Sequence, residues 1–261
     1  MRTKLLLILA TTGLLLSRCS KDAGSPGGMK IWQVYAEGQL QVEHSYNAQG
    51  LLDHQVVYGF QGRKTYEVTC YYDANKRLIK KETAIDFSSG PNPVWSYSYT
   101  GYSYGADSRI SEELNYIKQN NVDVLTSKIK PGYDSQGRLV SRSLYYPNDV
   151  LGLLTTYQYN AAGNIVLQEQ FRYNGAVPSI EYRYRYDNYD NQRNPYVGLP
   201  SATPPFSVNV NNILQTTVTN YVTTPGSPVT STNNAVYNSY NSRGLPLKLF
   251  ENGFNYTFEY R

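Results

Sequence analysis

The chain has 261 residues, of which 17% are charged and 27 are tyrosine. A coiled coil needs about half of its residues to be Ala, Glu, Lys, Leu and Arg, so that class is excluded, and an aromatic content of 14% argues against global disorder. The net charge of +4 comes largely from Arg2, Lys4 and Arg18, without which 21 basic residues face 20 acidic ones. We therefore expect no nucleic-acid partner held by bulk charge.

Residues 1–18 have the pattern of an export signal, with a basic start and an apolar run over residues 5–16. That run is shorter than the about 20 residues of a membrane-spanning helix. The sequence Leu16-Ser17-Arg18-Cys19 resembles a bacterial lipobox, which predicts lipidation of Cys19, although Arg18 replaces the usual small residue. An ordinary signal peptide with an incidental cysteine is the alternative. Residues 19–28 are rich in Gly and Ser and predict a flexible tether.

A short motif recurs along the rest of the chain: Tyr, then Asp or Asn, two turn-forming residues, Gly, and an aliphatic residue. Copies begin at Tyr46, Tyr133, Tyr159 and Tyr240, and degenerate copies begin at Tyr72, Tyr104 and Tyr186. The interval between Tyr186 and Tyr240 is about twice that between the other copies, which suggests an eroded copy near position 213. Asp or Asn with Gly is typical of a tight hairpin turn. Lys76 and Ser108 stand where Gly is expected, which predicts strained or differently closed turns there.

The segments between these turns alternate with a period of two, which favours strands. Residues 110–129 also show helical spacing, but their β-branched residues make a hairpin the preferred interpretation. Roughly sixteen short strands exceed what an open twisted sheet tolerates. We therefore predict one all-β domain over residues 29–261, an antiparallel meander of repeated hairpins forming a curled or coiled sheet. A polar, proline-rich insertion is expected at about 187–231, with one strand over residues 212–222.

The seven motif copies resemble YD repeats of the Rhs type. With the leader, the whole chain resembles uncharacterised Bacteroidota lipoproteins built from such repeats. In those proteins a polar Tyr-Asp-Asn…Asn-Pro corner precedes the irregular last third, as Tyr186-Asp187-Asn188 and Asn194-Pro195 do here. The resemblance implies an all-β fold and a lipid-anchored place in the cell envelope, at the periplasmic face or the outer surface of the outer membrane. It implies no activity.

Few residues suit catalysis or metal binding. If Cys19 is lipidated, Cys70 has no second cysteine to pair with. Its place in a predicted strand indicates that its side chain is buried and packs as a small apolar group. A disulfide framework or structural zinc site is excluded by the number of cysteines. His44 and His54 flank the first turn, where they could be cross-strand neighbours, but packing among polar strand residues is the preferred interpretation. We expect no metal and no cofactor.

Paired carboxylates of the glycosidase type remain an alternative, because the sequence does not show which acids meet across strands. The candidates are Glu112, Glu113, Glu169, Glu181 and Asp187.

An aromatic stripe is the main indication of function. Trp95, Tyr97 and Tyr99 share one face of a predicted strand, and flat rings with polar rims suit stacking against sugars. Tyrosine also simply covers half-buried sheet faces. We expect a non-enzymatic, lipid-anchored binding or scaffold module, attached to the membrane by its lipid and binding glycans or protein surfaces. A carbohydrate-active hydrolase and a purely structural envelope protein are the alternatives.

Overall fold

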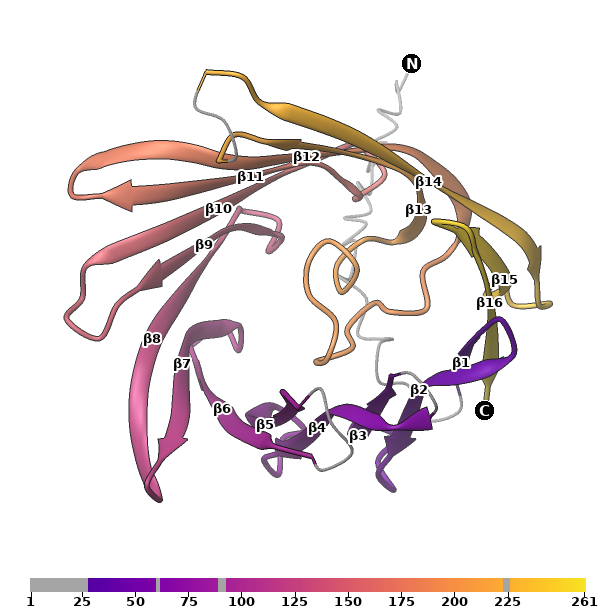
Figure 1. Ribbon diagram of the computed structural model, residues 1–261, viewed down its shortest axis with the longest axis horizontal. Helices are drawn as coiled ribbons and strands as arrows, with labels where there is room; N and C mark the ends of the chain where they lie inside the picture. The colour runs from indigo at the N-terminus through magenta and orange to yellow at the C-terminus, as the bar shows by residue number, and fades with distance from the viewer. Residues whose placement is uncertain (1–27, 60–61, 89–92, 223–225) are drawn as a thin grey trace, which may run out of the picture.

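The computed structural model describes residues 28–59, 62–88, 93–222 and 226–261. Within these residues, sixteen strands form a closed antiparallel barrel in chain order, with β1 pairing to β16 (Figure 1). The strands are β1 Ile31–Ala36, β2 Gln39–Tyr46, β3 Leu52–Tyr58, β4 Lys64–Tyr72, β5 Leu78–Asp86, β6 Trp95–Tyr104, β7 Ile110–Gln119, β8 Val122–Tyr133, β9 Leu139–Tyr145, β10 Leu151–Tyr159, β11 Ile165–Asn174, β12 Val177–Arg193, β13 Asn211–Asn220, β14 Val229–Tyr240, β15 Pro246–Glu251 and β16 Phe254–Tyr260.

The predicted meander of hairpins is confirmed, including the hairpin at residues 110–129 that forms β7 and β8. The predicted curled or coiled sheet is wrong in one respect, since the sheet closes on itself. Closure follows from the pairing of β1 with β16, which runs from Ile31 opposite Tyr260 to Ala36 opposite Tyr256 with one register shift between Ile31 and Gln33. This pairing satisfies the backbone groups of both edge strands. The predicted signal peptide and Cys19 lie outside the described residues.

The Tyr-Asp/Asn turns gather at one end of the barrel, here named the motif end, because each joins an even-numbered strand to the next odd one. The chain enters and leaves at this same end, where Lys30 and Arg261 exchange backbone hydrogen bonds. Gly137 and Gly163 take the positive φ that such turns require, +81° and +86°. Lys76 and Ser108 take it as well, with φ of +63° and +62°, which confirms the predicted strain.

Each turn is also linked to the following repeat. Asp73 accepts hydrogen bonds from the backbone of Asn75 and Arg77, and its carboxylate pairs with the Arg77 guanidinium at 2.7 Å. That guanidinium lies 4.9 Å from the ring centre of Tyr104, whose hydroxyl donates to the carbonyl of Leu78 at 2.8 Å.

The same arrangement recurs two repeats later, among Asp134, Arg138, Tyr159 and Leu139. The motif therefore joins neighbouring hairpins as well as closing each turn.

The copy at Tyr186 is the exception. The prediction of a turn there is wrong, because β12 continues to Arg193. Its irregularities there are Asn188, with φ of +56°, and a register shift against β13 between Tyr189 and Arg193. The irregular connection spans residues 194–210 and is shorter than the predicted insertion of 187–231. The predicted strand over residues 212–222 corresponds to β13.

Residues 194–210, here named the inner segment, fold back inside the ring of strands (Figure 1). Leu199 packs there in a core with Ile31, Val68 and Phe258 from the barrel wall. Lys81 reaches in from β5 and donates to the carbonyl of Pro200 at 3.4 Å. The inner segment therefore fills part of a lumen that sixteen strands alone would leave wide.

These contacts identify the two faces of the wall. Val68 and Cys70 face the lumen beside the inner segment, so Glu67, Thr69 and Tyr71 face outward by alternation. Cys70 is 3% exposed and has a free thiol, as predicted. Burial raises the pKa of this thiol to about 11. No helix among the described residues is long and apolar enough to cross a membrane.

Candidate functional site

The predicted aromatic stripe lies on the outside of the barrel. Thr83 pairs with Val68 on one side and with Ser98 on the other, so Ser98 faces the lumen. Tyr97 and Tyr99 therefore point outward. No register shift interrupts β6 until Tyr104, and Tyr102 consequently points inward with Glu113.

Tyr97 and Tyr99 line a groove of about 420 Å³ across β4 to β8, here named the outer groove. Tyr97 is 56% exposed, which is unusual for so large a ring in the middle of a sheet. Trp95 lies two residues before Tyr97 and is not part of the lining. The charged residues of the lining are Glu67, Lys80, Glu82, Lys118 and Asp123.

Contacts between side chains fix the second ring of the groove. Tyr99 stacks on Tyr116 of β7, with ring centres 4.7 Å apart and planes inclined by 14°. Its hydroxyl donates to Asp123 at 3.2 Å, and the Lys80 ammonium lies 4.7 Å from its ring centre. Loss of solvent and the Asp123 carboxylate raise the pKa of Tyr99. The ring is thereby held in one orientation, while Tyr97 leaves its face open.

The carboxylate of Glu82 is held in its ionised form. Lys80 contacts it at 2.6 Å and the hydroxyl of Tyr71 donates to it at 2.7 Å. These two hydrogen bonds keep the pKa of Glu82 below its usual range. Glu67 pairs with Lys64 at 3.0 Å. The groove therefore offers an open aromatic face bordered by hydrogen-bond acceptors and ammonium groups.

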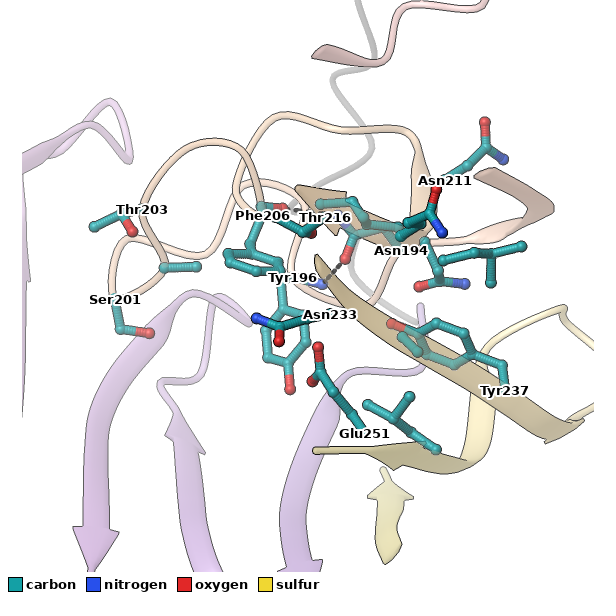
Figure 2. Close-up of a pocket in the computed structure, with 17 residues that line it drawn as sticks. Asn194, Tyr196, Ser201, Thr203, Phe206, Asn211, Thr216, Asn233, Tyr237 and Glu251 are labelled. Carbon is teal, nitrogen blue, oxygen red and sulfur yellow. Dashed lines mark hydrogen bonds between the residues drawn. The ribbon is translucent and has the colours of Figure 1, made fainter. Parts of the chain in front are cut away.

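A second cavity, here named the inner pocket, lies in the lumen between the inner segment and strands β13 to β15 (Figure 2). Its volume is about 390 Å³. Tyr196 and Phe206 of the inner segment pack edge to face with ring centres 6.5 Å apart. Asn194 fastens the segment by donating to the carbonyls of Phe206 and Asn209, at 2.7 and 2.9 Å.

Glu251, the last residue of β15, points into the inner pocket toward Tyr196 and Asn233 (Figure 2). Among the described residues its side chain forms no hydrogen bond and no ion pair, and burial raises the pKa of its carboxyl. The sequence analysis did not single out this residue. The sequence nevertheless contained a signal. Successive residues of a strand alternate between its two faces, so Glu251 lies on the same face as the buried Leu249 two residues before it.

The structure separates the two histidines. His44 pairs with Gln55, which is opposite Val68, so its side chain lies on the lumen side of the wall. His54 faces outward and contacts the hydroxyl of Thr69 at 3.1 Å. They cannot share one ion across the wall. No group of three His, Cys, Asp or Glu within the described part of the chain could hold a metal.

Four of the five candidate carboxylates lie beside an arginine. Glu113 contacts Arg142 at 2.7 Å and Glu169 contacts Arg183 at 2.7 Å. Glu181 pairs with Arg172, and Asp187 lies 3.7 Å from Arg185. Glu112 is on the opposite side of the wall from Glu113, since successive strand residues alternate. Four of the five acids are therefore paired with an arginine.

Comparison with known proteins bears on the repeats. Residues 133–170, which contain the turns at Tyr133 and Tyr159, match the RHS Repeat family. The match confirms the predicted repeat type in the middle of the chain. No curated protein matches the chain.

Several solved structures show similarity to this chain, and three of them are described here. A porin-like protein from Bacteroides uniformis has a TM-score of 0.40 and 9% identity, over 88% of this chain and 98% of its own. A porin-like protein from Bacteroides vulgatus has a TM-score of 0.42 and 10% identity, over 90% of this chain and 99% of its own. A TcdB2-TccC3-Cdc42 structure has a TM-score of 0.20 and 8% identity, over 83% of this chain and 16% of its own.

Proposed function

We propose that the protein is a non-enzymatic binding module of the cell envelope that holds carbohydrate in the outer groove. The open face of Tyr97 carries this proposal, because the ring contributes little to packing and borders a groove rich in polar groups. Exposed aromatic faces pack against the C–H groups of a sugar ring, and neighbouring carboxylate and ammonium groups bond its hydroxyls. Tyr99, fixed by Tyr116 and Asp123, would form the wall of the same site.

The outward-facing side chains of the barrel favour a domain that lies outside the bilayer. A barrel that spans a membrane presents an apolar band outward. Here the outward positions of the strands carry the ion pairs Lys80–Glu82 and Arg183–Glu169 and paired threonines such as Thr217 with Thr232.

Attachment would come instead from a lipid on Cys19, as the lipobox-like sequence indicates. Eight residues lie between Cys19 and Gly28, so the nine steps from one to the other reach at most about 30 Å. Because the chain enters at the motif end, that end would face the membrane. The outer groove lies on the side wall of the barrel, where the membrane would not cover it.

Binding is favoured over hydrolysis by the state of the acids. Glycoside hydrolysis requires one carboxylic acid that stays protonated near neutral pH. In the outer groove, Glu82 is held ionised by Lys80 and Tyr71, and Glu67 is paired with Lys64. The geometry therefore supports recognition of a sugar without cleavage.

A glycan array followed by calorimetry with the best-binding oligosaccharide tests this function. Tyr97→Ala should weaken binding at least about tenfold, the loss expected for one stacking ring of a small site. Phe254→Ala, which removes a 51% exposed ring from β16 on another side of the barrel, is the matched control, and Trp95→Ala is a second one. Release of shorter sugars from the bound oligosaccharide would support a hydrolase instead. An array without any binding would contradict both.

A further inference from the structure

The inner pocket contains a charge that the protein does not neutralise. Glu251 is the single charged residue of the pocket lining, and among the described residues no side chain or backbone group bonds its carboxylate. An ionised carboxylate in a confined, partly dry space is costly unless it meets a cation or a set of donors. Within the barrel, Glu113 meets Arg142 in this way, whereas Glu251 does not.

The groups around Glu251 suit one kind of partner. Tyr196, Phe206 and Tyr237 line the pocket, and their ring faces attract positive charge. Asn194 and Asn233 add amide oxygens that can accept hydrogen bonds. A carboxylate, aromatic rings and amides together match an ammonium group carried on a small organic molecule.

Other ligand classes fit less well. An anion would be repelled by Glu251, and a neutral sugar would leave its charge uncompensated. A metal ion needs several hard ligands, and Glu251 is the only carboxylate of the lining, which contains no His or Cys. The volume of about 390 Å³ lies at the lower end of the range for small-molecule sites.

We propose that the inner pocket binds a small primary amine, with Glu251 as its counter-charge and the rings of Tyr196 and Tyr237 beside it. The ligand would occupy the lumen beside the inner segment, separate from the outer groove. Binding there would stabilise the folded barrel, because the unfolded chain has no such site.

Calorimetric titration of the purified protein with tyramine and putrescine tests the proposal, with 4-(2-hydroxyethyl)phenol and 1,4-butanediol as neutral counterparts of similar size. We expect at least one amine to bind with a Kd below about 1 mM and its neutral counterpart to bind at least about tenfold more weakly. Glu251→Gln keeps the shape of the side chain and removes its charge, so it should abolish this difference.

Two controls locate the site. Glu259→Gln, which removes an exposed charge from β16, should leave amine binding unchanged. Tyr97→Ala should also leave it unchanged, so failure of the outer-groove proposal would not affect this result. Thermal unfolding of Glu251→Gln without ligand shows whether the variant is folded, and Tyr196→Leu provides a second variant expected to weaken binding. Equal binding of amines and neutral counterparts, no amine binding up to about 10 mM, or undiminished binding by folded Glu251→Gln would each overturn the proposal.

Discussion

Replacing Lys76 and Ser108 with glycine should stabilise the barrel. Both residues occupy the turn position where other copies have glycine, and both have a φ near +60°. Such a backbone costs a residue with a side chain roughly 1–2 kcal/mol. Glycine avoids this cost but loses about 0.5–1 kcal/mol through the greater freedom of the unfolded chain. The expected gain is therefore about 0.5–1 kcal/mol for each substitution.

No other contact complicates this comparison. Both side chains are exposed and form no hydrogen bond or ion pair within the described part of the chain. The turn bonds from the Lys76 and Ser108 backbone N–H groups, each 3.0 Å long, do not depend on the side chain. The two effects should be nearly additive, since the turns belong to different hairpins.

Urea unfolding followed by circular dichroism measures the change in the free energy of unfolding. Gly163→Ala is the reverse control: a Cβ there would meet Val210 at an ordinary 3.6 Å, so the φ of +86° alone should destabilise by about 1 kcal/mol. If Lys76→Gly and Ser108→Gly lowered the urea midpoint, or if Gly163→Ala raised it, the assignment of strain to these turns would be refuted.

Further predictions concern the core and its titrating groups. Leu199→Ala should lower the free energy of unfolding by about 2–5 kcal/mol, measured in urea, because it leaves a cavity between the inner segment and the wall; an effect below about 0.5 kcal/mol would show that the segment is not packed there. Tyr104→Phe should cost about 1 kcal/mol by removing its bond to Leu78, and an unchanged urea midpoint would contradict the proposed link between repeats. Burial lowers the pKa of His44 to about 4, below its unfolded value, so its stabilising contribution of up to about 3 kcal/mol is complete above about pH 6.5 and is lost as the pH falls toward 4; His44→Gln should flatten this part of the stability profile. The Cys70 thiol should react with Ellman's reagent only after unfolding, and rapid reaction of the native protein would contradict its burial.

The repeats made the strands predictable because each turn motif specifies its own hairpin locally. Closure was not predictable in the same way, since a motif such as that at Tyr133 fixes only neighbouring strands. Whether β1 meets β16 depends on the strand tilt and stagger accumulated over the whole sheet.

The inner segment was predicted as an irregular insertion but not as the content of the lumen. Proline and polar residues predicted an insertion, and such sequences usually lie on the surface of a protein. The contrary signal was the presence of Tyr196, Leu199 and Phe206 in a segment without alternation, because large apolar side chains in a loop need a surface to cover. The inner pocket was missed for the same reason, since six of its 17 lining residues belong to this segment.

The contacts of its hydroxyl show whether a tyrosine serves the fold by joining hairpins or is left available for binding. Tyr46, Tyr72 and Tyr159 each donate to a backbone carbonyl of the adjoining hairpin, as Tyr104 does, so their position in the motif is explained by the fold. Tyr97 stands outside the motif, and its ring is mostly exposed. The need for a tyrosine hydroxyl to bond the neighbouring hairpin therefore does not explain why position 97 is a tyrosine. A tyrosine that the repeat does not need, placed beside the fixed ring of Tyr99, is the kind of residue that a binding function would retain, and this favours Tyr97 over the inward tyrosines as the first position to test.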